Sequence, residues 1–235
     1  MRVMKLGGLQ ARVTGGVDGA GGGDGPVAVL CHGFGAPGDD LVALGPMLRA
    51  PADTRFVFPA APLTVEGMEQ MRAWWMIDLE RLTLGARRSF DTAEVPSGLA
   101  EARARLSALL DDVERELHTG GRRLVLGGFS QGAMLALDVA LHRAAPLAGL
   151  VLLSSTLIAE REQTPLLAAR RGLPVLLAHG QEDPLLPFSV AETLRERLAS
   201  AGLDVEWMAF RGGHEIPLPV LRAVGRFLAR VAPPA

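Results

Sequence analysis

The sequence predicts an α/β fold: a mostly parallel central sheet with helices on both faces, in a single domain over residues 1–235. Two observations predict it. Short, continuously apolar runs are typical of buried parallel strands, and segments with apolar residues at helical spacing lie between most of them. Such alternation is typical of a sheet that is covered on both faces. A chain of 235 residues is also long enough to bury a substantial core.

Six apolar runs are the predicted strands. They are PVAVLCHGF at 26–34, TRFVFPA at 54–60, RRLVLGGFS at 122–130, LAGLVLLSS at 147–155, LPVLLAHG at 173–180 and DVEWMAFRG at 204–212. Helical spacing predicts helices over 97–118, 131–144, 189–202 and 217–231. Before the third of these helices, Ser189 and Glu192 have the spacing of a capping box.

One segment, GGVDGAGGGDG at 15–25, is rich in glycine. Ordering so many glycines in a strand or helix costs much conformational entropy, so the segment is predicted to be a flexible loop. No Gly-Lys-Ser/Thr sequence follows it, which argues against a phosphate-binding loop.

Composition excludes several partners. Apolar residues make up 49% of the chain, charged residues 21%, and the net charge is −2, which gives no electrostatic basis for binding nucleic acid or an anionic membrane. The single cysteine, Cys31, suits a reducing compartment. No apolar run approaches the ~18 residues of a membrane span, and the N-terminus lacks the apolar region of a signal peptide. We therefore expect a cytoplasmic protein without stable membrane insertion.

Chemically active side chains follow the predicted strands. In open α/β sheets, functional groups gather at the carboxyl ends of the strands. His32, Ser130, Asp183 and His214 each come at or just after the end of an apolar run. This placement predicts a site at one edge of the sheet.

Ser130 is the candidate nucleophile. It lies in GGFSQGA at 127–133, where Gly128 and Gly132 permit a sharp turn between a strand and a helix. A serine hydroxyl needs a base within hydrogen-bond reach, and a third group to orient that base. The alternative is a glycine-rich loop in which the serine has no catalytic role.

The base and its orienting acid are sought among five histidines and the nearby carboxylates. His214 lies in RGGHEIP, between the last strand and the last helix, and is the candidate base. Asp183 precedes Pro184, which favours an extended conformation before it, and is the preferred acid, with Glu182 as the alternative. The order Ser130, Asp183, His214 is typical of an α/β-hydrolase.

An oxyanion hole requires two backbone N–H groups, one after the nucleophile and one from an earlier strand-end loop. Gln131 would supply the first. Phe34, between Gly33 and Gly35, would supply the second.

Four ordered motifs resemble the phospholipase/carboxylesterase family of small α/β-hydrolases, which includes bacterial carboxylesterases and acyl-protein thioesterases. They are HGFG at 32–35, GFSQGA at 128–133, HGQEDPLLP at 179–187 and GGHEI at 212–216. The resemblance implies a triad of Ser130, Asp183 and His214, oxyanion donors at Phe34 and Gln131, and neither a metal nor an organic cofactor. The chain departs from the family at Ala36, where an acidic residue is frequent.

Residues 71–98 resemble the family's tryptophan-containing segment and cover loop, which would serve instead of a large cap domain. Within it, Trp74 is the expected substrate-pocket residue. Trp75 and the methionines Met68, Met71 and Met76 are expected mostly in the core. The three arginines of the loop, Arg81, Arg87 and Arg88, would form a solvated face or meet an anionic head group.

The sequence thus predicts a serine carboxylesterase that forms an acyl-enzyme on Ser130 and takes a small-molecule ester, or a thioester, with an apolar acyl group. One alternative is a lysophospholipase or acyl-protein thioesterase with a narrow substrate. Another is a non-catalytic binding protein that keeps the hydrolase fold.

Overall fold

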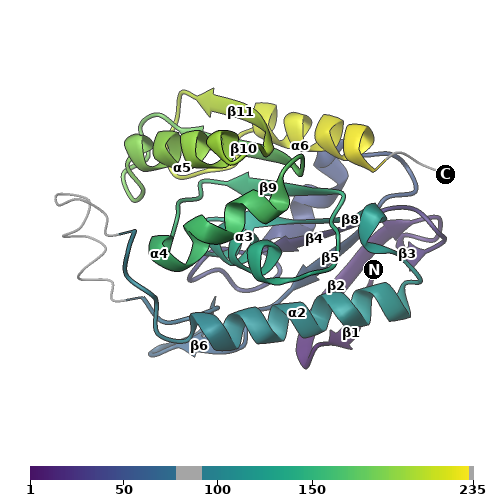
Figure 1. The fold of residues 1–235 in the computed structure, drawn as a ribbon. Helices are drawn as coiled ribbons and strands as arrows, with labels where there is room; N and C mark the ends of the chain where they lie inside the picture. The colour runs from purple at the N-terminus through teal and green to yellow at the C-terminus, as the bar shows by residue number, and fades with distance from the viewer. Residues whose placement is uncertain (78–91, 233–235) are drawn as a thin grey trace.

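The computed structural model describes residues 1–77 and 92–232. In this part of the chain, nine strands form one sheet with the order β1-β2-β5-β4-β8-β9-β10-β11, and β3 pairs with β2 off that path. Figure 1 shows the sheet with its covering helices. The strands are β1 (Arg2–Leu6), β2 (Leu9–Gly16), β3 (Ala20–Gly22), β4 (Val27–Cys31), β5 (Arg55–Pro59), β8 (Leu124–Phe129), β9 (Gly149–Leu153), β10 (Pro174–Gly180) and β11 (Asp204–Phe210).

In the order of the sheet, the strands from β5 to β11 run parallel. The β1–β2 and β2–β5 pairs are antiparallel, and the short strand β3 pairs with β2 in parallel. The six predicted strands therefore form the parallel part of the sheet, and the α/β prediction is confirmed. Strand β11 differs in one respect: it is an edge strand whose side chains are mostly half-buried, because only β10 pairs with it.

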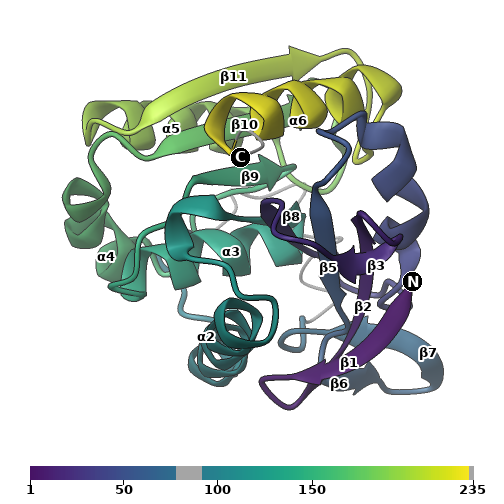
Figure 2. The same ribbon diagram turned by 90° about the vertical axis from the view of Figure 1, so that its right-hand side faces the viewer.

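Helices cover both faces of the sheet. One face carries α2 (Leu99–Glu116), α3 (Gln131–His142), α4 (Glu160–Gln163), η3 (Thr164–Arg170) and α5 (Phe188–Ser200). The other carries η1 (Asp40–Leu48) and α6 (Leu218–Val231), which pack on a second apolar cluster. Figure 2 shows the two layers on opposite sides of the sheet. A short turn, η2 (Gly121–Arg123), precedes β8.

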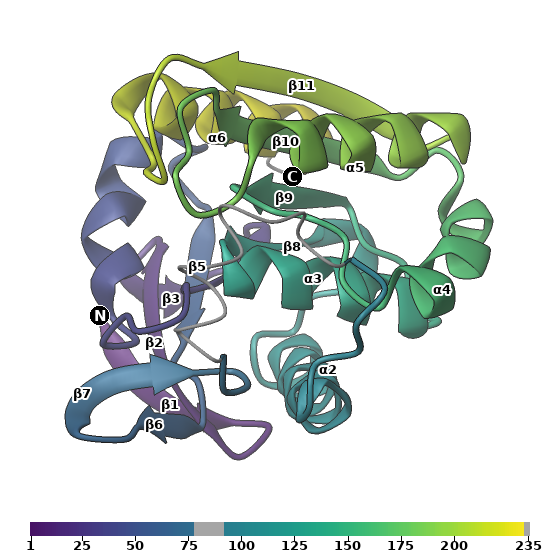
Figure 3. The ribbon, with the colours of Figure 1, turned by 90° about the vertical axis from the view of Figure 1, so that its left-hand side faces the viewer.

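A separate hairpin, β6 (Leu63–Val65) with β7 (Met68–Ala73), lies at a corner of the molecule, at the lower left of Figure 3. The sequence did not predict this hairpin, nor the N-terminal strands β1 and β2. No helix within the described ranges is both long and apolar enough to span a bilayer.

The glycine-rich segment at 15–25 was predicted to be a flexible loop, but parts of it form strands: β2 ends at Gly16 and β3 covers Ala20–Gly22. Gly15 has a φ of +70°, and a Cβ there would lie 2.2 Å from the carbonyl oxygen of Thr54. The Asp18 carboxylate accepts hydrogen bonds from the N–H groups of Ala20 and Gly22, both at 2.8 Å. These bonds and the close approach to β5 offset the entropy cost on which the prediction depended.

The predicted capping box is also absent from the structure. Helix α5 begins at Phe188 with Pro187 at its N-cap and has no side-chain cap. Ser189 therefore lies inside the first turn, where its carbonyl oxygen accepts a hydrogen bond from the Thr193 hydroxyl at 2.9 Å.

Candidate active site

Ser130 occupies a sharp turn between β8 and α3. Its φ is +53° and its ψ is −121°, a conformation that non-glycine residues rarely adopt. The Ser130 N–H donates to the Leu153 carbonyl at 2.8 Å, which holds the turn against β9. Strain of this kind persists where the surrounding structure enforces it, and it concentrates at functional sites.

The flanking glycines make this turn possible. A Cβ on Gly132 would lie 2.2 Å from the Cys31 carbonyl oxygen, and one on Gly128 would lie 2.4 Å from the same oxygen. Strand β4, strand β8 and helix α3 therefore approach more closely than any side chain would permit.

Asp183 and His214 meet on the neighbouring loops. The Asp183 Oδ2 atom lies 2.7 Å from His214 Nδ1, and the Asp183 side chain is fully buried. Its Oδ1 atom accepts hydrogen bonds from the N–H groups of Leu185 and Leu186, both at 2.9 Å. Burial raises the pKa of Asp183, but the hydrogen bonds from His214, Leu186 and Leu185 outweigh it, so that the net pKa lies below the usual range.

Backbone bonds hold these two loops together. The N–H of Gln181 donates to the Phe210 carbonyl at 2.8 Å, and the N–H of Glu182 donates to the Gly212 carbonyl at 2.9 Å. The β10–β11 pairing thus continues beyond the strand ends and fixes the separation of the acid and the imidazole.

His214 lies beside the strand that carries the serine. Its ring is 4.7 Å, centroid to centroid, from the ring of Phe129, the residue before Ser130. Within the described ranges, no hydrogen bond joins His214 to the Ser130 hydroxyl. Such bonds are often long in unliganded enzymes and tighten when substrate binds.

The alternative acid, Glu182, has a different environment. It is exposed, and Oε1 lies 3.4 Å from Nε of the exposed Arg211. It therefore faces solvent, while Asp183 faces the imidazole.

Two other histidines support loops, as the sequence predicts. His32 Nε2 accepts the Ala61 N–H at 2.9 Å, so its proton lies on Nδ1, which donates to the Gly33 carbonyl at 2.7 Å. His179 Nε2 lies 2.9 Å from the Leu186 carbonyl. Burial lowers the pKa of both histidines, which keeps them neutral.

The two candidate oxyanion donors follow residues already described: Gln131 comes directly after Ser130, and Phe34 comes two residues after His32. Gln131 is the first residue of α3, where a backbone N–H has no acceptor inside the helix. The Phe34 N–H belongs to the same peptide as the Gly33 carbonyl. Since that peptide is planar and trans, the His32 bond to the carbonyl also sets the direction of the Phe34 N–H.

Trp74 does not have the position that the sequence predicted for it. It is only 1% exposed, and its indole N–H donates to the His32 carbonyl at 2.9 Å. Trp75 is buried as well, as expected. Their burial follows from the buried end of β7, where the chain turns inward beside α2 and α3.

The methionines of the same stretch are exposed rather than in the core. Met68, Met71 and Met76 are 48%, 39% and 48% exposed. The sulfur of Met71 lies 3.9 Å from the position of a Cβ on Gly35, beside the loop that contains Phe34. The remainder of the predicted cover segment, residues 78–91 with Arg81, Arg87 and Arg88, lies outside the described residues.

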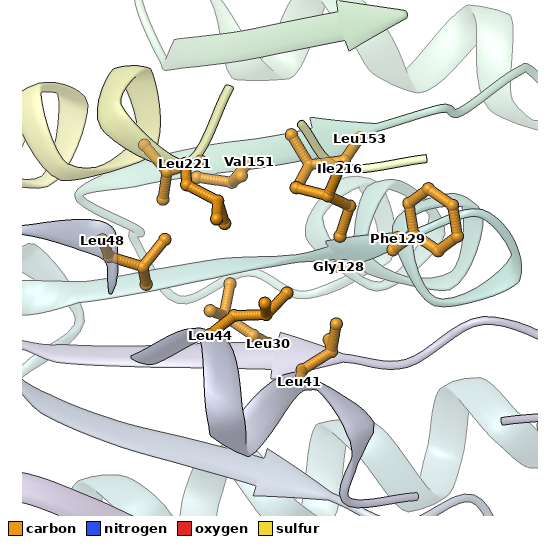
Figure 4. Close-up of a pocket in the computed structure, with 11 residues that line it drawn as sticks. Leu30, Leu41, Leu44, Leu48, Gly128, Phe129, Val151, Leu153, Ile216 and Leu221 are labelled. Carbon is orange, nitrogen blue, oxygen red and sulfur yellow. The ribbon is translucent and has the colours of Figure 1, made fainter. Parts of the chain in front are cut away.

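An apolar cavity of about 20 Å³ lies between the sheet, η1 and α6, with Phe129 in its lining (Figure 4). Its lining is entirely apolar and includes Leu30, Leu41, Phe129, Val151, Ile216 and Leu221. This volume holds about one small group, and neither Ser130 nor His214 lines it. We therefore do not assign it to the substrate.

Cys31 lies next to His32 but is completely buried, and burial raises the pKa of its thiol well above the usual range. It behaves as a core residue, as predicted, and has no access to a substrate.

The parallel sheet, the strained serine turn and the strand-end position of the other polar groups define the class of this protein: it has the α/β-hydrolase fold. A description of the phospholipase/carboxylesterase family matches residues 21–232. The chain belongs to the phospholipase/carboxylesterase family, and it is a hydrolase, as the sequence predicted.

Known relatives agree with this assignment. Acyl-protein thioesterase 1 of Gibberella zeae is 30% identical over 191 residues, which cover 77% of this chain and 79% of the relative. The crystal structure of esterase PE8 superposes with a TM-score of 0.81 at 32% identity, and covers 95% of this chain and 99% of that one. The Bacillus cereus carboxylesterase shares the fold, with a TM-score of 0.69 at 19% identity over 95% of this chain and 94% of that one.

Proposed function

We propose that this protein is a serine esterase that hydrolyses carboxylic esters with an apolar acyl group, through an acyl-enzyme on Ser130. The observation that carries the proposal is the strained turn of Ser130 at the start of α3, together with the 2.7 Å contact between the buried Asp183 carboxylate and the half-buried His214 ring.

In the first half of the reaction, His214 takes the proton of the Ser130 hydroxyl as the oxygen attacks the acyl carbonyl. Asp183 holds the imidazole with its proton on Nδ1 and stabilises the imidazolium that forms. The N–H groups of Phe34 and Gln131 bind the oxyanion, and His214 then protonates the leaving alcohol or thiol.

In the second half, water attacks the acyl-enzyme. His214 takes a proton from this water, and the same two N–H groups bind the second oxyanion. Return of the proton to Ser130 releases the carboxylic acid.

The exposed methionines of the β6–β7 hairpin offer the acyl group an apolar surface. Met71 lies next to Gly35, one residue from the proposed oxyanion donor Phe34. Methionine side chains adapt to ligands of different shape, which supports a broad acyl preference.

Replacing Ser130 with alanine tests the nucleophile. We expect Ser130→Ala to lower kcat for p-nitrophenyl esters by ~10³-fold or more and to leave the fold intact, because the other groups cannot form an acyl-enzyme. A fluorophosphonate should label the wild type at Ser130 and not label the variant. Near-normal turnover by Ser130→Ala, or no labelling of the wild type, would favour the non-catalytic binding protein.

The acyl-protein thioesterase relatives favour a second candidate, hydrolysis of a narrow set of thioesters. Turnover of p-nitrophenyl esters across acyl lengths should be compared with turnover of palmitoyl thioesters and lysophosphatidylcholine. A flat ester profile supports a broad carboxylesterase, whereas strong preference for one thioester or lysolipid supports the narrow alternative.

We also infer a cytoplasmic location. The support is that the single cysteine, Cys31, is buried and reduced, as suits a reducing compartment. Fractionation of the producing cells checks this inference, and recovery outside the cytoplasm would contradict it.

A further inference from the structure

The two proposed oxyanion donors are connected by residues 72–75, which we call the bridge. The bridge runs from the end of β7 to the two buried tryptophans, between helix α3 and the loop of residues 32–36 that contains Phe34. It contacts both sides through hydrogen bonds of side chain and backbone.

On the α3 side, the side chain of Gln131 binds the bridge at two points. Its Oε1 atom accepts the N–H of Trp74 at 3.0 Å, and its Nε2 atom donates to the Trp75 carbonyl at 2.7 Å. Gln131 is 1% exposed, so water cannot replace these bonds. A long polar side chain is buried at this position, and its carboxamide satisfies one backbone donor and one acceptor.

On the side of Phe34, the bridge binds the chain before and after that residue. The Trp74 indole donates to the His32 carbonyl at 2.9 Å. The Gly35 N–H donates to the Arg72 carbonyl, and the Arg72 N–H donates to the Ala36 carbonyl, both at 2.9 Å. The Phe34 N–H is therefore enclosed between fixed points at residues 32, 35 and 36.

We propose that the Gln131 carboxamide and the Trp74 indole are positioning residues that set the distance between the two oxyanion N–H groups. This inference rests on the proposed function. Gln131 thus has two separate tasks: its backbone N–H binds the oxyanion, and its side chain holds the partner loop at the required separation. Trp74 contributes to catalysis from the core and does not touch the substrate.

The test compares Gln131→Leu and Trp74→Phe with two matched controls. Gln163→Leu removes a buried glutamine whose Nε2 atom donates to Asp138 at 3.0 Å, in α4 and away from the bridge. Trp207→Phe changes a tryptophan on the edge strand β11. The controls report the effect of losing a similar side chain without altering the oxyanion loop.

The readouts are kcat and KM for p-nitrophenyl butyrate, and the affinity for an alkyl trifluoromethyl ketone, whose serine adduct places an oxyanion in the hole. Loss of a whole oxyanion donor typically costs ~10²–10³ in kcat, so a misplaced donor should cost about 10-fold or more. We expect this loss in both test variants with KM changed less than about threefold, and an equal loss of affinity for the ketone. The controls should keep both values.

Three results overturn the proposal: unchanged kcat in Trp74→Phe, ketone affinity that does not follow kcat, or an equal loss in the controls. If Gln131→Leu does not fold, Trp74→Phe decides, because it keeps a smaller aromatic ring in the core and removes the indole donor, while Trp207→Phe makes the same chemical change away from the bridge. A wild type that neither hydrolyses the ester nor reacts with a fluorophosphonate refutes the proposed function itself. An active wild type with equally active variants refutes only the positioning role of Gln131 and Trp74.

Discussion

Asp183 and Glu182 are adjacent carboxylates in one loop, and burial separates their roles. The Asp183 side chain has no exposed surface and is bound by two backbone N–H groups and by His214. The Glu182 side chain is 64% exposed. Its partner is the exposed Arg211, and an ion pair this exposed contributes little to stability. The carboxylate that contacts the imidazole of His214 is that of Asp183.

Asp183→Asn should lower kcat for p-nitrophenyl esters by about 10³- to 10⁴-fold, because an amide no longer selects the imidazole tautomer with its proton on Nδ1. Glu182→Gln is the matched control in the same loop and should stay within about twofold of the wild type. Steady-state kinetics on both variants measures this. The reverse order of effects would assign the acid to Glu182.

The sequence located Ser130, His214 and Asp183 at strand ends, because apolar runs that end in polar residues mark those positions clearly. It could not place Trp74. A tryptophan in a short polar-apolar stretch fits a pocket wall as well as the core, and only the structure, through the burial of Trp74 and its hydrogen bond to the His32 carbonyl, separates the two. The side chain of Gln131 was missed too, although a long polar residue inside an apolar helix start is a signal that it needs partners.

At the scale of elements, close contact of β4, β8 and α3 determines the sharp turn at Ser130. A Cβ on Gly132 would lie 2.2 Å from the Cys31 carbonyl oxygen. That oxygen belongs to the backbone of a central strand, so it cannot move aside. The glycines around Ser130 are therefore required by packing as well as by the sharp turn.

Gly132→Ala should lower the free energy of unfolding by about 3 kcal/mol or more and abolish esterase activity, because α3 must move away from β4. Gly120→Ala is the control. Gly120 has an extended conformation, with φ −94° and ψ 158°, and no atom within 4 Å of an added Cβ. It should change stability by less than about 1 kcal/mol. Urea unfolding of both variants measures this, and equal stabilities would contradict the packing argument.

Helices and strands with strong apolar patterns were predictable, whereas the N-terminal strands were not. Strand β2 ends in two glycines with positive φ, and its stability comes from antiparallel pairing with β1 and β5. The pairing with β5 joins segments that are distant in the sequence and leaves no local pattern. The β6–β7 hairpin is local, but β6 has only three residues, too few to show the alternation of a strand.

At the scale of the whole molecule, the sheet separates two apolar layers that have different tasks. The layer with α2, α3 and α5 contains Cys31, Trp74 and the bridge, and it supports the loop of residues 32–36. The layer with η1 and α6 supports the other side of Phe129 and Ile216, next to the Ser130 and His214 turns. Alternation of strand and helix predicted both layers, but it carried no information on which layer contains Trp74 and the bridge.

Two histidines in this interior, His32 and His179, give folding a pH dependence. Their side chains are 2% and 0% exposed, and burial lowers the pKa of both below the ordinary value of 6.5. Below about pH 6.5 the unfolded chain therefore binds protons that the folded chain does not, and stability falls as the pH falls. Asp40 acts in the opposite direction, since burial raises its pKa. Asp183, with a lowered pKa, loses its contribution only at more acidic pH.

We expect the free energy of unfolding to decrease between about pH 7.5 and about pH 5.5, by at most about 1.4 kcal/mol for each histidine. Both histidines have charged neighbours: Asp40 interacts with His32, and Asp183 with His179, whose Nε2 atom lies 3.5 Å from Asp183 Oδ2. His179→Gln keeps a possible N–H donor for the Leu186 carbonyl and removes the titration, so it should lose about half of the pH dependence. Urea unfolding at the two pH values measures both effects. Equal wild-type stability at both would contradict the burial of neutral imidazoles, and an unchanged dependence in His179→Gln would assign the effect to other groups.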